Sequence, residues 1–99
     1  MYRIVWEFEA EPSRVAEFER AYGSGGAWAT FFRRGAGYLD TELFRSAIQP
    51  SRYLTVDRWA SRSAYEAFRA AFGAEYAALD ARCEPLTRSE RLLAAAEEP

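Results

Sequence analysis

The feature that most constrains the fold of this chain is a change of hydrophobic period at Trp59. Residues 52–59 alternate between apolar and polar side chains, as a half-buried β-strand does, whereas from Ser61 onwards apolar residues recur at helical spacing. The largest side chain of the region lies at this junction. Trp59 therefore either lines a pocket or packs in the core where a strand meets a helix, and the sequence leaves both interpretations open.

Similar patterns along the chain predict four strands and several helical segments. The predicted strands cover residues 2–10, 38–46, 52–59 and 91–97, and the helical stripes fall within 12–22, 28–34, 63–72 and 75–83. The turn signal at residues 49–51 joins the second and third strands into a hairpin. The order strand, helix, strand, strand, helix, strand predicts a ferredoxin-like α+β fold (βαββαβ), with an antiparallel sheet and helices on one face, for residues 1–99 as a single domain.

The helix boundaries are predicted from local signals. Pro12 and Ser13 indicate a helix start, and Ser63 with Glu66 has the spacing of a capping box. The glycine-rich residues 23–26 predict a break in the first helical segment, and Gly73 is expected to end the later one.

Helices on one face of a sheet leave its other face uncovered. Val5 would face water there, together with either Leu39 and Leu43 or Tyr38 and Phe44. We therefore expect a homodimer in which two copies pack sheet on sheet.

The composition excludes several classes of function. The chain has no His and no Lys, a single cysteine (Cys83) and a net charge of −2, so it lacks the residues for common metal, haem, zinc-cluster and P-loop sites and shows no basic footprint for nucleic acid. Neither a leader segment nor an apolar stretch of membrane-spanning length is recognisable, and a cytoplasmic location is expected. Cys83 is interpreted as a small core residue.

Aromatic residues make up 16% of the chain, which is more than one small core readily hides, and the surplus favours a pocket or a subunit interface. Seven aromatic side chains are predicted to meet between the helices and the sheet and to bind a small apolar or aromatic ligand; the alternative is plain core packing. These candidates are Trp6, Trp28, Phe31, Phe32, Tyr65, Phe68 and Phe72.

Two carboxylates are candidate bases. Asp57 or Glu42 could accept a proton if burial raised its pKa, and the alternative is that these carboxylates form ion pairs with arginines of neighbouring strands. Trp59 and Asp57 are the predicted catalytic residues.

The chain resembles the antibiotic biosynthesis monooxygenase domain of the dimeric α+β barrel superfamily. The similarity covers essentially all 99 residues and rests on Glu11-Pro12 after the first strand, on Gly37-Tyr38-Leu39, and on the strand at 53–59. The most specific part is the run from Trp59 to Phe68, a tryptophan at the strand end followed by a Ser-capped helix.

This resemblance implies a protein that oxidises a small aromatic or polycyclic phenolic substrate without metal, haem or flavin. The haem-degrading branch of the family relies on a His and an Asn that this chain lacks, which argues against haem. Among the residues of the quinone-forming oxygenases, only the tryptophan has a match, at Trp59. Two alternatives stay open: a non-catalytic binding or stress-response protein that holds an apolar metabolite, and a plain dimerisation module.

Overall fold

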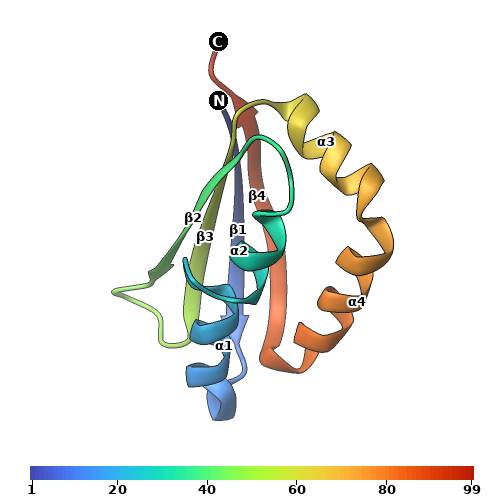
Figure 1. Cartoon of the computed structure of the whole chain (residues 1–99). Coiled ribbons are helices and arrows are strands. Elements are labelled where there is room, and N and C mark those ends of the chain that lie inside the picture. The colour runs from blue at the N-terminus through green and yellow to red at the C-terminus, as the bar shows by residue number, and fades with distance from the viewer.

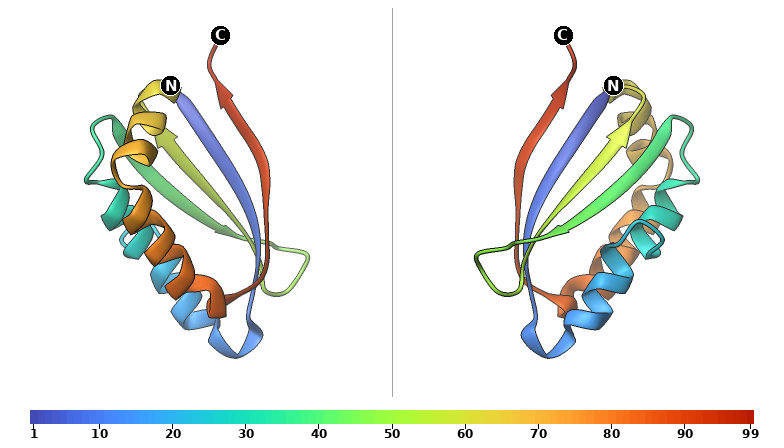
Figure 2. Two further views of the ribbon diagram at one scale, coloured as in Figure 1. Left: turned by 90° about the vertical axis from the view of Figure 1, so that its right-hand side faces the viewer. Right: turned by 90° about the vertical axis from the view of Figure 1, so that its left-hand side faces the viewer.

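The computed structural model describes residues 1–99 and confirms the ferredoxin-like fold (Figure 1). Its elements are β1 (Tyr2–Ala10), a 3₁₀ turn (Pro12–Arg14), α1 (Val15–Tyr22), α2 (Ala27–Phe32), β2 (Tyr38–Arg45), β3 (Arg52–Trp59), α3 (Arg62–Ala71), α4 (Gly73–Cys83), a second 3₁₀ turn (Glu84–Leu86) and β4 (Thr87–Glu97). The strands form one antiparallel sheet in the order β2-β3-β1-β4. All four α-helices cover the same face of this sheet, and the opposite face carries none (Figure 2).

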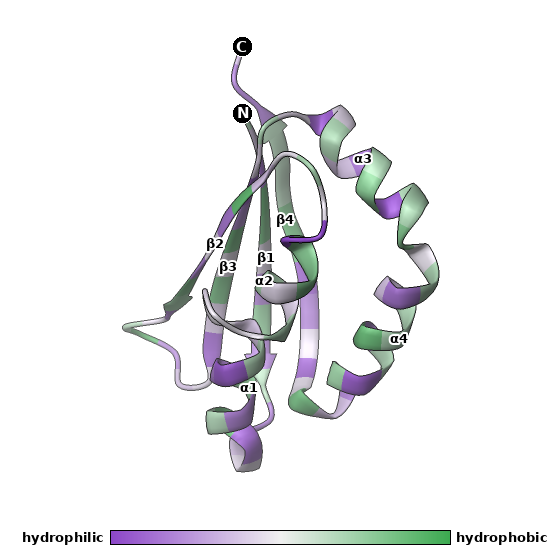
Figure 3. Ribbon diagram, in the orientation of Figure 1, coloured by the Kyte–Doolittle hydropathy of each residue, from purple (hydrophilic) through white to green (hydrophobic).

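The alternation of residues decides which side of each strand is buried. In β3, Tyr53, Thr55, Asp57 and Trp59 are buried under the helices, and the residues between them are half-buried on the open face. Hydrophobic and hydrophilic residues also follow one another around α3 and α4 (Figure 3). In β3 the two-residue period of the sequence is therefore the period of burial.

A β-bulge in β2 changes which side chains reach the open face. Tyr38 pairs with Trp59 and Asp40 pairs with Arg58, so Leu39 is an extra residue with no partner in β3. Tyr38 consequently packs against the core, while Leu39 and Phe44 are 47% and 48% exposed. The predicted pairs were Leu39 with Leu43 and Tyr38 with Phe44, and each pair has one member on the open face and one, Leu43 or Tyr38, packed against the core. Strict alternation fails because it does not hold across a bulge.

Several helix boundaries differ from the sequence-based predictions. Ser61, and not Ser63, caps α3, where its Oγ accepts a hydrogen bond from the backbone N–H of Ala64. Gly73 is the first residue of α4 and not the end of α3 as expected, since α3 ends at Ala71 with Phe72 as its C-cap. No helix combines the length and the apolar character that a membrane span requires.

The last strand is longer than predicted. β4 begins at Thr87, four residues before the predicted start at Arg91, because it pairs with β1 along the whole length of that strand. Nearly all of β4 is exposed, and it forms an edge of the sheet. The pairing of β4 with the central strand β1 has therefore outweighed the weak strand propensity of the β4 residues.

Candidate functional site

A cavity of about 200 Å³ lies between the sheet and the helices. Every strand and every α-helix contributes to its lining, which consists of Trp6, Phe8, Tyr22, Trp28, Phe32, Thr41, Thr55, Asp57, Arg69, Tyr76, Asp80 and Glu90. Its volume lies below the range of about 300–1,000 Å³ that is usual for sites of drug-sized molecules, so it suits a small ligand. Its lining combines aromatic rings with a few charged groups, as small-molecule sites generally do.

Asp57 is the most deeply buried charged residue of the cavity. It lies on the helix-covered side of β3 with only 7% of its surface exposed. The hydroxyl of Thr41, on the neighbouring strand β2, donates a hydrogen bond of 2.6 Å to Oδ1 of Asp57. Since this bond uses the one hydroxyl proton of Thr41, the Tyr38 hydroxyl must donate the adjoining bond of 2.7 Å to Thr41.

The surroundings of Asp57 favour its protonated form. Burial raises the pKa of this carboxyl to about 6, the Thr41 hydrogen bond opposes the shift, and the charge of Asp40 adds to it. No protein group donates a hydrogen bond to the second oxygen, Oδ2. Asp57 therefore carries a free carboxylate oxygen at the cavity and exchanges its proton close to neutral pH.

Three further charged groups line the cavity. The guanidinium of Arg69 lies 3.8 Å from the centre of the Tyr76 ring and donates a hydrogen bond of 3.0 Å to the Tyr65 hydroxyl. Asp80 on α4 and Glu90 on β4 form no ion pair and no side-chain hydrogen bond with the protein. Glu90 and Asp80 are both exposed at the rim of the cavity, and partial withdrawal from water raises the pKa of Glu90, with the charges of Asp80 and Glu84 raising it further.

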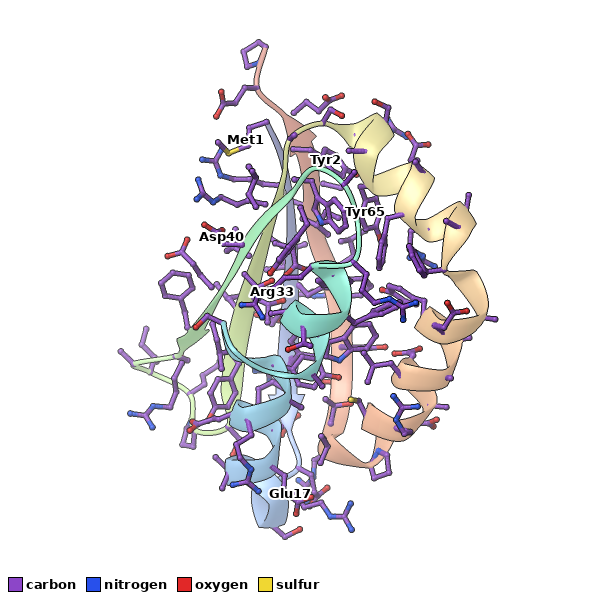
Figure 4. The ribbon with its side chains drawn as sticks, viewed as in Figure 1. Met1, Tyr2, Glu17, Arg33, Asp40 and Tyr65 are labelled. Atoms are coloured by element: carbon purple, nitrogen blue, oxygen red, sulfur yellow. The ribbon has the colours of Figure 1, made fainter.

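The predicted ligand-binding residues separate into two groups in the structure. Trp6, Trp28 and Phe32 line the cavity together with Asp57. The other four do not reach it: Phe31 faces a second hollow of about 650 Å³ between α2 and α4, whereas Tyr65, Phe68 and Phe72 pack in or against the core. Figure 4 shows Tyr65 between α3 and the sheet, and Asp40 on the side of β2 that points away from the helices.

Trp59 does not line the cavity either. Its side chain is completely buried and packs against Phe32, Tyr38, Tyr65 and Phe68, with ring centroids 5.2–5.8 Å apart. Its indole N–H is buried without a hydrogen-bond partner. This placement favours the core-packing interpretation of Trp59 over direct contact with a ligand.

The sequence-based prediction missed several groups of the cavity. Thr41, Arg69 and Tyr76 lie on elements whose patterns were recognised, but nothing in those patterns distinguishes them from ordinary surface or core residues. The predicted hairpin could have placed Thr41 beside Asp57, since the two residues pair across β2 and β3. The bulge at Leu39 hid this pairing, because it changes which residues of β2 face the helices.

Comparisons with known proteins agree with this architecture. The sequence profile described as antibiotic biosynthesis monooxygenase matches residues 1–78. A structure assigned to the same description from Deinococcus radiodurans has a TM-score of 0.76 at 17% identity, covering 100% of this chain and 93% of that one. One from Bordetella bronchiseptica also has a TM-score of 0.76, at 21% identity, covering 99% and 96%.

A third similar structure is that of a variant of SnoaB, a cofactor-independent oxygenase from Streptomyces nogalater. It has a TM-score of 0.65 at 25% identity, and the alignment covers 98% of this chain and 94% of that one. No curated protein matches the chain. The profile match over most of the sequence shows that the chain belongs to the antibiotic biosynthesis monooxygenase family.

Proposed function

We propose that this protein is a cofactor-independent monooxygenase that acts on a small aromatic or polycyclic phenolic substrate, with Asp57 as the base. The observation that carries the proposal is a buried carboxylate with a pKa of about 6 and one unpartnered oxygen at an aromatic cavity. A base with a pKa near neutrality is effective in general base catalysis. The similarity to a cofactor-independent oxygenase supports the reaction class.

In the proposed reaction the substrate supplies the electrons. Oδ2 of Asp57 takes a proton from the substrate, and the resulting phenolate or enolate reduces dioxygen. One oxygen atom stays on the substrate as a new carbonyl, and the other leaves as water with two hydrogens of the substrate, namely the proton that Asp57 removed and the remaining hydrogen of the oxidised carbon. The aromatic side chains of Trp6, Trp28 and Phe32 hold the ring, and Arg69 is the cation available to the oxyanion.

The test is oxygen uptake with a panel of anthrone- and naphthol-like compounds, combined with ligand titration followed by Trp fluorescence. Asp57→Asn should lower turnover by about a hundredfold or more while leaving ligand affinity within a few fold, because the amide keeps the shape but is no base. Glu42→Gln on the open face of the sheet removes a carboxylate outside the cavity and serves as the matched control. Unchanged turnover in Asp57→Asn would refute the assignment of the base.

The same cavity also suits the second candidate function, a non-catalytic protein that holds an apolar metabolite. The placement of Trp59 outside the cavity favours this alternative, since the one residue that the family resemblance carried over does not reach the ligand space. If the wild-type protein binds compounds of the panel tightly but takes up no oxygen, the result supports the non-catalytic binding protein. If it binds none of them, the result supports the plain dimerisation module.

We also propose that residues 1–99 form one domain, that two copies pair through the open face of the sheet, and that the protein is cytoplasmic. Leu39, Phe44 and Leu93 are each 44–48% exposed, and Phe44 and Leu93 lie together at one hollow of this face. Sedimentation equilibrium should show a dimer. Phe44→Arg should dissociate it, and Ala67→Arg on the exposed side of α3 should not. A monomer of 11.3 kDa at micromolar concentration would contradict the pairing.

A further inference from the structure

The cavity gathers carboxylates that have no basic partner. Elsewhere the arginines of this chain neutralise acidic residues: Arg52 and Arg91 contact Glu7, and Arg58 binds Asp40 through two hydrogen bonds. Asp57, Asp80 and Glu90 take part in no such pair, although thirteen arginines are available in the sequence. The cavity therefore holds three carboxylates without an ion pair, while seven carboxylates elsewhere in the chain are paired with arginines.

One of these carboxylates is aimed at the ligand space and buried. Asp57 is more than nine-tenths buried, lines the cavity, and has an Oδ2 atom that receives no hydrogen bond from the protein. The ionised form of a buried carboxyl that accepts a single hydrogen bond is costly unless something outside the protein compensates its charge. Metal coordination does not supply this compensation, because no three carboxylates of the chain lie close enough together to hold an ion.

Most of the remaining lining is aromatic, and it contains one basic group. Tyr22 and Tyr76 contribute phenol groups from α1 and α4, and Arg69 on α3 is the one cation of the lining. The guanidinium of Arg69 is directed at the ring of Tyr76 and the hydroxyl of Tyr65. With three ionised carboxylates against one guanidinium, the lining carries a formal charge of −2.

We propose that the cavity selects aromatic ligands that carry a positively charged nitrogen, such as a protonated amine, over aromatic anions of the same size. The ammonium group would lie near Asp57, and the charges of Asp80 and Glu90 elsewhere in the lining would add to the attraction. The ring would lie among the aromatic side chains, which themselves attract cations through their faces. This inference rests on the proposed function, because it names the substrate class of the same cavity. It also bears on that chemistry: a phenolate is disfavoured where three carboxylates face a single guanidinium, and a cation on the substrate would reduce this cost.

The experiment compares three naphthalene derivatives that differ in charge. The ligands are 2-naphthylmethylammonium, 2-naphthol and 2-naphthoate, titrated at pH 8 and low salt with Trp fluorescence as the readout. We expect the ammonium to bind about tenfold or more tightly than the carboxylate, with the naphthol between them. Raising the salt concentration should reduce the difference, since partly exposed charges are screened.

Variants locate the effect. Asp80→Asn and Glu90→Gln should each lower the ammonium-to-carboxylate affinity ratio about threefold to fivefold, and the double variant should lower it further. Glu17→Gln changes the net charge by the same amount on the exposed side of α1 and should leave the ratio unchanged. Lowering the pH from 8 to 5 protonates Asp57 and should weaken ammonium binding in the wild-type protein, because the ammonium keeps its charge over this range.

Equal or tighter binding of 2-naphthoate overturns this inference while leaving the proposed oxygenase function intact, provided that 2-naphthol binds and consumes oxygen. The inference is also overturned if Glu17→Gln lowers the ammonium-to-carboxylate affinity ratio as much as Asp80→Asn does. The preference would then depend on the net charge of the protein and not on the charges of the cavity. If none of the three compounds binds, both this inference and the proposed function fail.

Discussion

Replacing Asp57 with Asn should stabilise the folded protein at neutral pH, although it removes a candidate catalytic group. The carboxyl has an ordinary pKa of 3.8 and a pKa of about 6 in the folded chain. The folded state therefore binds the Asp57 proton more tightly than the unfolded state, so ionisation of Asp57 opposes folding. A difference of about two pKa units corresponds to about 3 kcal/mol of free energy of unfolding.

The sign of this effect fixes its pH dependence. Below pH 3.8 the carboxyl is protonated in both states and contributes no penalty; the penalty grows between pH 3.8 and 6 and is complete above pH 6. Asn has no such ionisation, and its amide oxygen can still accept the hydrogen bond from Thr41. The variant should therefore match the wild-type protein near pH 4 and exceed its stability by about 2–3 kcal/mol at pH 7–8.

Urea unfolding of both proteins from pH 4 to pH 8, at one fixed protein concentration, measures this difference. Asp40→Asn is the matched control of opposite sign, because the hydrogen bond from Arg58 holds the pKa of Asp40 below 3.8. The stabilising contribution of Asp40 is present above pH 3.8 and is lost only at lower pH, so this variant should be less stable than the wild-type protein by an amount that changes little between pH 5 and pH 8. A difference between Asp57→Asn and wild type that stays constant from pH 4 to pH 8 would refute the reasoning that burial opposes the ionisation of Asp57.

Three further predictions follow from the packing around the site. Thr41→Val removes the hydroxyl donor and should raise the pKa of Asp57 above 6, whereas Thr41→Ser should restore it; a carboxyl NMR titration that shows no shift would contradict the role of this hydrogen bond. Trp59→Phe should lower the free energy of unfolding by about 1–2 kcal/mol while ligand affinity changes little, because the ring lies outside the cavity; a selective loss of binding would return Trp59 to the ligand site. Gly35→Ala would place its Cβ 2.6 Å from a Phe68 side-chain atom and should cost about 1–3 kcal/mol in thermal unfolding, and unchanged stability would show that this part of the core can yield.

The sequence by itself determined the periodicity of the chain and, through it, the fold. The first and third strands begin and end where the alternation does, at Tyr2–Ala10 and Arg52–Trp59, because a half-buried strand must alternate along its own length. The order of the elements then leaves few topologies that place all helices over one face of the sheet. Three of the seven aromatic residues that the sequence suggested as ligand-binding, Trp6, Trp28 and Phe32, line the cavity.

Only the tertiary structure decided where the polar chemistry lies. Thr41 and Asp57 are 16 residues apart and meet because β2 and β3 pair in a register shifted by the bulge at Leu39. A bulge is a property of two paired strands, so the periodicity of either strand alone does not reveal it. The pKa of Asp57 depends in the same way on the helices that exclude water from its strand, since burial is the joint result of every element packed around it.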